Sequence, residues 1–149
     1  MKKVIALALA MVMCLAAFAG CGAKEVKLDE VMKTINTEYK LSLKSIDDLN
    51  KYYQVNNDDV KQFAAEINGD TNAPVEIVLV EAKDKDAAAN VEKALQARLT
   101  SIVNMYGSYT PEKKAMAEAC KVTNENNFVT MIVADNAADI LNTFNQQVK

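Results

Sequence analysis

The sequence contains no histidine among its 149 residues. Histidine is the side chain most used as a general base and as a metal ligand, and it belongs to most nucleophilic triads. Its absence excludes the enzyme classes that depend on an imidazole. Glycine is scarce too, because only Gly69 and Gly107 follow the first 22 residues. A phosphate-binding loop needs several glycines close together, so a glycine-rich nucleotide site is also excluded.

A long apolar run is missing as well. Apolar residues dominate only from Val4 to Phe18, after Lys2 and Lys3, whereas a membrane-spanning helix needs about 20 apolar residues. A basic start, a short apolar stretch and a small-residue end at Ala19-Gly20 are the organisation of a secretory signal peptide. We therefore expect an export signal and not a membrane span.

The export signal ends at a cysteine. Phe18-Ala19-Gly20-Cys21 resembles the bacterial lipobox, although that motif prefers Leu where Phe18 stands. The resemblance implies cleavage between Gly20 and Cys21 and a diacylglyceryl lipid on the Cys21 thiol; the alternative is a cleaved signal in which Cys21 has no role. Two acyl chains anchor a protein stably, whereas one does not. We expect the protein to be held at the outer face of the cytoplasmic membrane through a lipid on Cys21.

Cysteine is therefore scarce in the mature chain. Cys14 leaves with the signal and Cys21 carries the lipid, so Cys120 remains as the one thiol. It cannot form an intramolecular disulfide or a thiolate zinc site, and we expect neither a metal nor a cofactor. Neighbouring lysines would lower the pKa of Cys120, but its small apolar neighbours favour a buried, unreactive thiol.

Negative charge predominates once the signal is removed. The whole chain has a net charge of −3, and residues 1–20 hold two lysines and no acid. Removing them leaves 15 basic and 20 acidic residues, a net charge of −5. Nucleic acids and anionic headgroups require a basic surface, so we expect no nucleic-acid partner.

The mature part has the size of one domain. We divide the chain into a signal peptide (1–20), a lipidated cysteine with a short tether (21–27) and a single domain (28–149). Apolar spacing and capping residues predict helices that begin near Leu28, Ile46 (capped by Ser45), Asp84 or Asp86, Pro111 and Ala137. Strands are predicted over 60–67, 75–80 and 128–133, the first two as a hairpin and the second in a central position, with a polar turn over 123–127. For 60–67 a short capped helix is the alternative. This order favours an α+β fold, a two-layer sandwich of a small, mostly antiparallel sheet packed against a long amphipathic helix and shorter helices.

Several of these segments resemble one family. They are the lipobox, the Asp58-Asp59-Val60 segment with Phe63, the strand over 75–80, the helix that carries Arg98, the Tyr109-Thr110-Pro111 junction and the strand that begins Asn127-Phe128-Val129. Together they are similar to the DUF4358 lipoproteins of Firmicutes over about residues 40 to 145. The resemblance implies a clostridia-like source and an extracytoplasmic lipoprotein. Because the family is named for lacking a known function, it implies no catalytic or binding residues.

Carboxylates are the reactive groups that remain. The segments 57–59 and 68–70 could offer oxygen ligands to Ca²⁺, but neither has the ligand spacing of a calcium loop, and we expect turn and cap residues there. Glu76 and Glu81 bracket a strand and could form a paired-carboxylate site. We expect instead that water solvates both at the ends of the strand.

Three other side chains are candidates for a binding surface. Arg98, on the polar flank of the long helix, could hold a carboxylate with two hydrogen bonds or form a surface ion pair with Glu92 or another neighbour. Tyr106 and Tyr109 could line a sugar or peptide groove, or they could complete the core at the end of that helix.

These patterns favour a non-enzymatic module that binds a small molecule or an envelope protein. The alternative is a carboxylate-dependent envelope hydrolase, which requires two acids in one cleft with perturbed pKa values. A third hypothesis is an accessory subunit of a transporter or envelope complex. We rank binding and accessory roles above catalysis.

Overall fold

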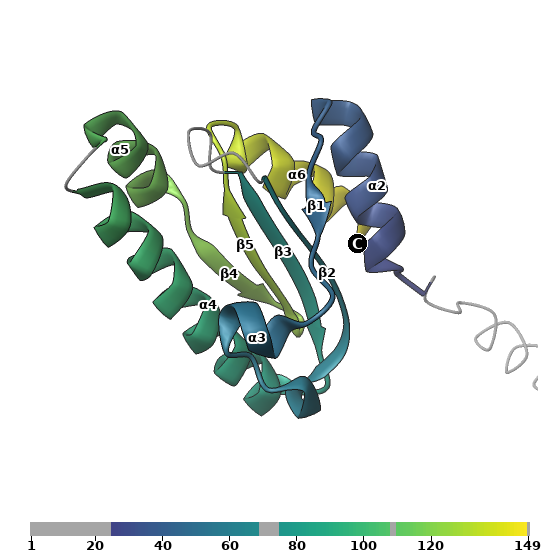
Figure 1. The fold of residues 1–149 in the computed structure, drawn as a ribbon. Helices are drawn as coiled ribbons and strands as arrows, with labels where there is room; N and C mark the ends of the chain where they lie inside the picture. The colour runs from purple at the N-terminus through teal and green to yellow at the C-terminus, as the bar shows by residue number, and fades with distance from the viewer. Residues whose placement is uncertain (1–24, 69–74, 108–109, 149) are drawn as a thin grey trace, which may run out of the picture.

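The computed structural model describes residues 25–68, 75–107 and 110–148 (Figure 1). The described helices are α2 (Leu28–Tyr39), α3 (Leu49–Tyr53), the short 3₁₀ helix η1 (Asn57–Asp59), α4 (Lys85–Gly107), α5 (Pro111–Ala119) and α6 (Ala137–Gln147). The described strands are β1 (Lys44–Ser45), β2 (Val60–Ile67), β3 (Glu76–Ala82), β4 (Val122–Glu125) and β5 (Phe128–Val133). The predicted cleavage site at Gly20 and Cys21, and Tyr109, lie outside the described residues.

The strands form one sheet in the order β1-β2-β3-β5-β4, and every pairing is antiparallel. β3 lies at the centre, as its nearly continuous apolar run predicts, because both faces of a central strand are buried. β2 and β3 pair as the predicted hairpin, with Ile67 opposite Glu76. β5 pairs along the other edge of β3, with Val133 opposite Glu76.

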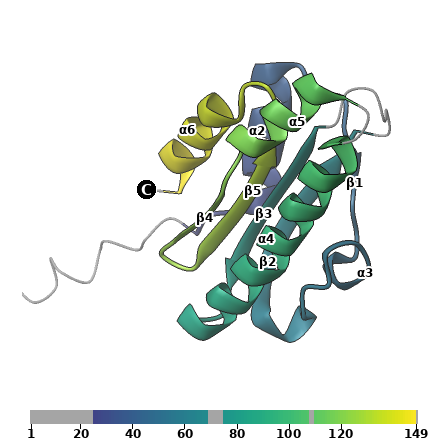
Figure 2. The ribbon, with the colours of Figure 1, turned by 90° about the vertical axis from the view of Figure 1, so that its left-hand side faces the viewer.

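Helices cover both faces of this sheet (Figures 1 and 2). α3, α4 and α5 pack on one face, against residues such as Val78 and Met131. α2 and α6 pack on the other, against residues such as Ile77 and Ile132. The predicted α+β fold, with an antiparallel sheet packed against a long helix and shorter helices, is confirmed, and the structure adds α2 and α6 as a further layer. Among the described helices, none is both long enough and apolar enough to cross a membrane.

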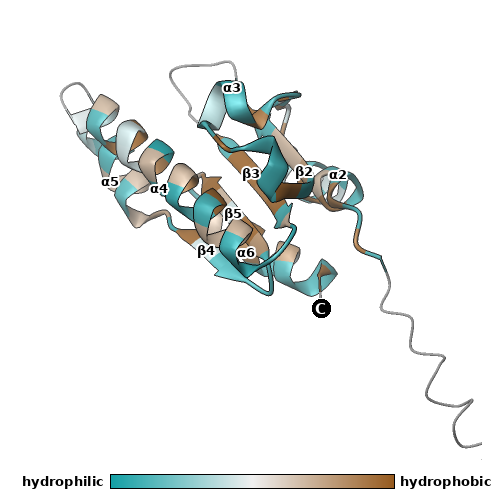
Figure 3. Cartoon of the chain, turned by 90° about the horizontal axis from the view of Figure 1, so that it is seen from below, coloured by the Kyte–Doolittle hydropathy of each residue, from teal (hydrophilic) through white to brown (hydrophobic). Residues whose placement is uncertain are grey.

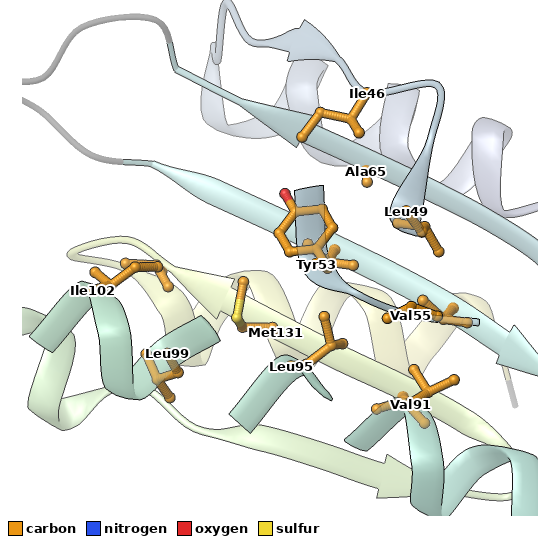
Figure 4. Packing of buried hydrophobic residues seen from close by; sticks show 14 of the residues in the cluster. Ile46, Leu49, Tyr53, Val55, Ala65, Val91, Leu95, Leu99, Ile102 and Met131 are labelled. Carbon is orange, nitrogen blue, oxygen red and sulfur yellow. The ribbon is translucent and has the colours of Figure 1, made fainter. Parts of the chain in front are cut away.

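α4 supplies much of the larger core cluster. Val91, Leu95, Leu99 and Ile102 point toward the sheet and are at most 4% exposed (Figure 4). Burying a side chain of this size contributes about 1.5–3 kcal/mol. The colouring in Figure 3 shows the same division, with hydrophobic strands between helices whose outer surfaces are largely hydrophilic. The core therefore fixes the position of α4, and with it the polar side chains on the flanks of that helix.

The predicted turn over 123–127 is too long, because only Asn126 and Asn127 form a turn. Val122–Glu125 forms the edge strand β4, which pairs with β5. Asn126 and Asn127, both with positive φ, connect the two strands, as a two-residue hairpin turn requires. The exposed, polar composition of this edge strand resembles that of a turn, and only its pairing with β5 identifies it as a strand.

One predicted helix cap is wrong and another is confirmed. Asp48, and not Ser45, caps α3, because its carboxylate accepts a hydrogen bond of 3.1 Å from the Lys51 amide. Ser45 belongs to β1 instead. Asp84, one of the two predicted caps of α4, accepts a hydrogen bond of 2.9 Å from the Ala87 amide.

Candidate functional site

A buried ion pair joins the start of β3 to the middle of α4. Glu76 lies on the α4 side of the sheet and is only 3% exposed. The Arg98 Nε donates to its Oε1 at 3.0 Å, and the Arg98 Nη2 donates to its Oε2 at 2.9 Å. This two-point geometry is the strongest way for arginine to hold a carboxylate. The pair fixes the guanidinium of Arg98 in one orientation, with a third of the side chain still exposed.

Two tyrosines lie close enough to this pair to respond to its charges. Tyr53, at the end of α3, is 4% exposed, and its buried hydroxyl has no hydrogen-bond partner among the described residues. Burial, and after it the negative charge of Glu76, raises the pKa of Tyr53 far above its usual range. The same two causes, in the same order, raise the pKa of Tyr106. Both phenols therefore stay protonated, and the Tyr53 hydroxyl is buried close to the Glu76 carboxylate.

A groove of about 460 Å³ lies between α3 and α4, beside these residues. Binding sites for small molecules span about 300–1,000 Å³, so the groove is large enough for a ligand of a few rings. Its lining comes from both helices and consists of Tyr52, Tyr53, Gln54, Asn90, Lys93, Ala94, Ala97, Arg98 and Ser101. We call it the α3–α4 groove.

The α3–α4 groove is rich in hydrogen-bond donors. Lys93 and Arg98 line it and no acid does, although the chain as a whole is acidic. Arg98 uses only Nε and Nη2 for Glu76, so its Nη1 keeps two donors. Lys93 has no acidic partner in the described part of the chain. These two side chains suit a ligand with acceptor oxygens, above all a carboxylate or another anion.

Metal chemistry has no support in the described ranges. They contain no group of three or more aspartate, glutamate or cysteine side chains placed to hold an ion. Asp58 and Asp59 belong to η1, which the Asn56 side chain caps, and Asp59 accepts a hydrogen bond from Asn90. These residues are turn and cap residues, as expected. Gly69 and Asp70 lie outside the described residues.

The structure brings together two of the three predicted surface residues. Arg98 and Tyr106 both lie near Glu76, and Tyr106 is 9% exposed, so its ring completes the core and does not form an exposed patch. Arg98 forms its ion pair with Glu76 and not with Glu92, whose carboxylate accepts a hydrogen bond from Asn124. Tyr109 lies outside the described residues.

The expectation that water solvates Glu76 is wrong. Its side chain is buried against α4, while Glu81 is partly exposed and bonds to Lys61 and Gln62. The two carboxylates bind different partners in different elements, so they do not form a paired site. One signal in the sequence pointed to this arrangement: an acid in an otherwise apolar central strand needs a buried cation, and Arg98 lies on the helix that follows.

Sequence reasoning missed Tyr53 and Lys93 as site residues. No local pattern distinguishes them, because the groove exists only where α3 packs beside α4. Cys120 is buried, as expected, and burial raises the pKa of its thiol.

A family model described as "Domain of unknown function (DUF4358)" matches residues 33–134. The match covers more than half of the chain, and the chain therefore belongs to this family. No curated protein and no solved structure matches the chain.

Proposed function

We propose that this member of the DUF4358 family is a lipid-anchored extracytoplasmic binding module that holds an anionic, oxygen-rich group in the α3–α4 groove. One observation carries the proposal: Lys93 and the partly exposed Arg98, whose Nη1 donors are not used by Glu76, line a groove that no acid lines. A ligand with acceptor oxygens would pair with both side chains through charge-assisted hydrogen bonds, each of which contributes about 1.5–3 kcal/mol.

The pair also prepares the groove for binding. Glu76 lies on the central strand and Arg98 on the longest helix, so rigid elements hold both. A donor that is already oriented loses little entropy when it binds a ligand. The net charge of the groove also favours an anion. Glu76 neutralises Arg98, so the positive charge of Lys93 supplies the net attraction.

The location part of the proposal is supported by the N-terminal sequence alone. Lys2 and Lys3, the apolar stretch and the lipobox-like end support export and lipid attachment at Cys21. An acidic surface suits an exported binding module better than a nucleic-acid binder. The ligand would be a small molecule of the envelope or an acidic side chain of an envelope protein. If it is the side chain of an envelope protein, this protein would act as an accessory subunit of that partner. A Firmicutes source remains part of the same proposal.

The hydrolase alternative has less support. Acid catalysis by carboxylates needs two such groups near the reacting bond. The lining of the α3–α4 groove contains none, and Arg98 occupies both oxygens of the nearby Glu76. Binding is therefore the role that the groove serves best.

A titration with two matched sugars tests this proposal. Glucuronate and glucose share a ring and differ in one carboxylate, so each can be added to the ¹⁵N-labelled mature protein while amide signals are followed. We expect glucuronate to shift the signals of groove residues such as Gln54, Asn90 and Ser101, and glucose to shift them less. The proposal is wrong if glucuronate leaves the groove signals in place, or if both sugars act equally.

A further inference from the structure

The side chain of Gln62 on β2 forms hydrogen bonds with the first residues of the folded domain. Its Nε2 donates to the Val26 carbonyl at 2.7 Å, and its Oε1 accepts from the Leu28 amide at 3.0 Å. The same Nε2 also donates to Glu81. Val26 packs against the core cluster of α2 and α6, and Leu28 is fully buried. The chain is therefore fixed to the domain from Val26 onward, on the side of the sheet that α2 and α6 cover.

The distance from this point to the proposed anchor is short. Cys21 precedes Val26 by five residues, which span at most about 18 Å when fully extended. A folded domain of this size has a radius of gyration of about 14 Å, and is roughly 36 Å across. To bring its opposite side to the bilayer, the tether would have to pass around half of the domain, a path of roughly 57 Å at that diameter. The tether is too short by a factor of about three.

We infer that the side formed by α2 and α6 faces the bilayer, and that the α3–α4 groove opens away from it. The inference rests on the lipid anchor of the proposed function. Figures 1 and 3 show α2 on the opposite side of the sheet from α3 and α4. The bilayer is the partner of the α2–α6 side, and the groove is left accessible to ligands in the envelope.

Surface charge does not set this orientation. The exposed residues of α2 carry both signs, with Asp29, Glu30 and Glu38 beside Lys33. A mixed surface has no net attraction to anionic headgroups. The tether alone is then responsible, and the orientation is independent of the salt concentration.

Tryptophan fluorescence can measure the orientation, because the chain has no tryptophan of its own. Thr34 on α2 and Thr100 on α4 form a matched pair: both are exposed and both donate to the carbonyl four residues earlier. Thr34→Trp and Thr100→Trp are made separately in the full-length lipoprotein, which is then reconstituted in phosphatidylcholine vesicles that contain a dansyl-headgroup lipid. We expect strong energy transfer to dansyl from the α2 position and little from the α4 position.

A longer tether provides the decisive control. A Gly/Ser insert of about 15 residues between Lys24 and Glu25 extends the maximum reach to roughly 70 Å, so the opposite side can also approach the bilayer and the difference in energy transfer between the two positions should become smaller. Three results would overturn the inference: equal transfer with the native tether, a difference that the insert leaves undiminished, or a difference that high salt removes. Cys21→Ser removes the proposed lipidation site and is the reference for an unanchored protein. If the native protein also fails to bind the vesicles, the proposed anchor is wrong. Failure of the orientation alone appears as bound protein with equal transfer.

Discussion

Glu76 and Arg98 depend on each other at the scale of single residues. A carboxylate in a central strand is stable only when a cation and hydrogen bonds compensate for lost water, and Arg98 supplies both. Arg98 in turn owes its orientation to Glu76. The contribution of this buried pair to stability therefore differs from that of the exposed pair Lys114–Glu118, which contributes little.

We predict that Glu76→Gln lowers the free energy of unfolding by about 3 kcal/mol, because it leaves the Arg98 charge beside the core without its counter-ion. Urea denaturation of both proteins measures the difference. Glu118→Gln is the matched control and should cost less than about 1 kcal/mol. Similar losses for the two variants would mean that the buried pair is no more important than a surface contact.

Tyr53→Phe is predicted to change how stability depends on pH. The pKa of Tyr53 in the folded protein lies above the value near 10 of the unfolded chain. As the pH rises through 10, the unfolded chain releases this proton first, so the free energy of unfolding falls. The stabilising contribution of the raised Tyr53 pKa is fully present below a pH of about 10.

Urea denaturation between neutral and strongly alkaline pH checks this prediction. Tyr53→Phe should reduce the alkaline loss, although Tyr106 keeps its own part of it, and should leave stability at neutral pH unchanged or slightly higher, since it removes an unpaired hydroxyl. Tyr52→Phe, at a side chain that is 47% exposed, is the control. An unchanged alkaline slope in Tyr53→Phe would show that the phenol does not titrate differently in the two states.

At the scale of elements, the sequence predicts the helices and strands that local residue patterns specify. The periodicity of α4 and the apolar run of β3 each specify an element that buries its apolar residues, and both elements occur where expected. β1 has two residues and exists only through pairing with β2, so no pattern could indicate it. β4 was missed because an exposed edge strand is polar. The Arg98–Glu76 contact and the α3–α4 groove depend on the packing of distant segments, which local pattern does not determine.

The cap of α4 gives a prediction at this scale, because the sequence alone allowed Asp84 or Asp86. The structure assigns the cap to Asp84, so Asp84→Ala should lower the free energy of unfolding by about 1 kcal/mol. Asp86→Ala removes only a first-turn charge and should cost about 0.3–0.5 kcal/mol. Thermal or urea denaturation ranks the two variants, and the reverse order would contradict the assigned cap.

At the scale of the whole molecule, two sides of the sheet take two roles. On the α2–α6 side, Gln62 binds the start of the folded domain at Val26 and Leu28. The other side carries the α3–α4 groove and the buried ion pair. Ligand binding in the α3–α4 groove is the central claim, since the proposed anchor and the proposed orientation have a function only if a ligand binds there.

One comparison of dissociation constants tests that claim most directly. Lys93 lines the groove, whereas Lys85 lies on the same helix outside it, and Lys→Gln at either exposed position should leave the fold intact. In the glucuronate titration we predict that Lys93→Gln raises the dissociation constant roughly tenfold or more, which is the value of one lost charge-assisted hydrogen bond, while Lys85→Gln leaves it unchanged. Equal constants for the two variants would contradict binding in the α3–α4 groove.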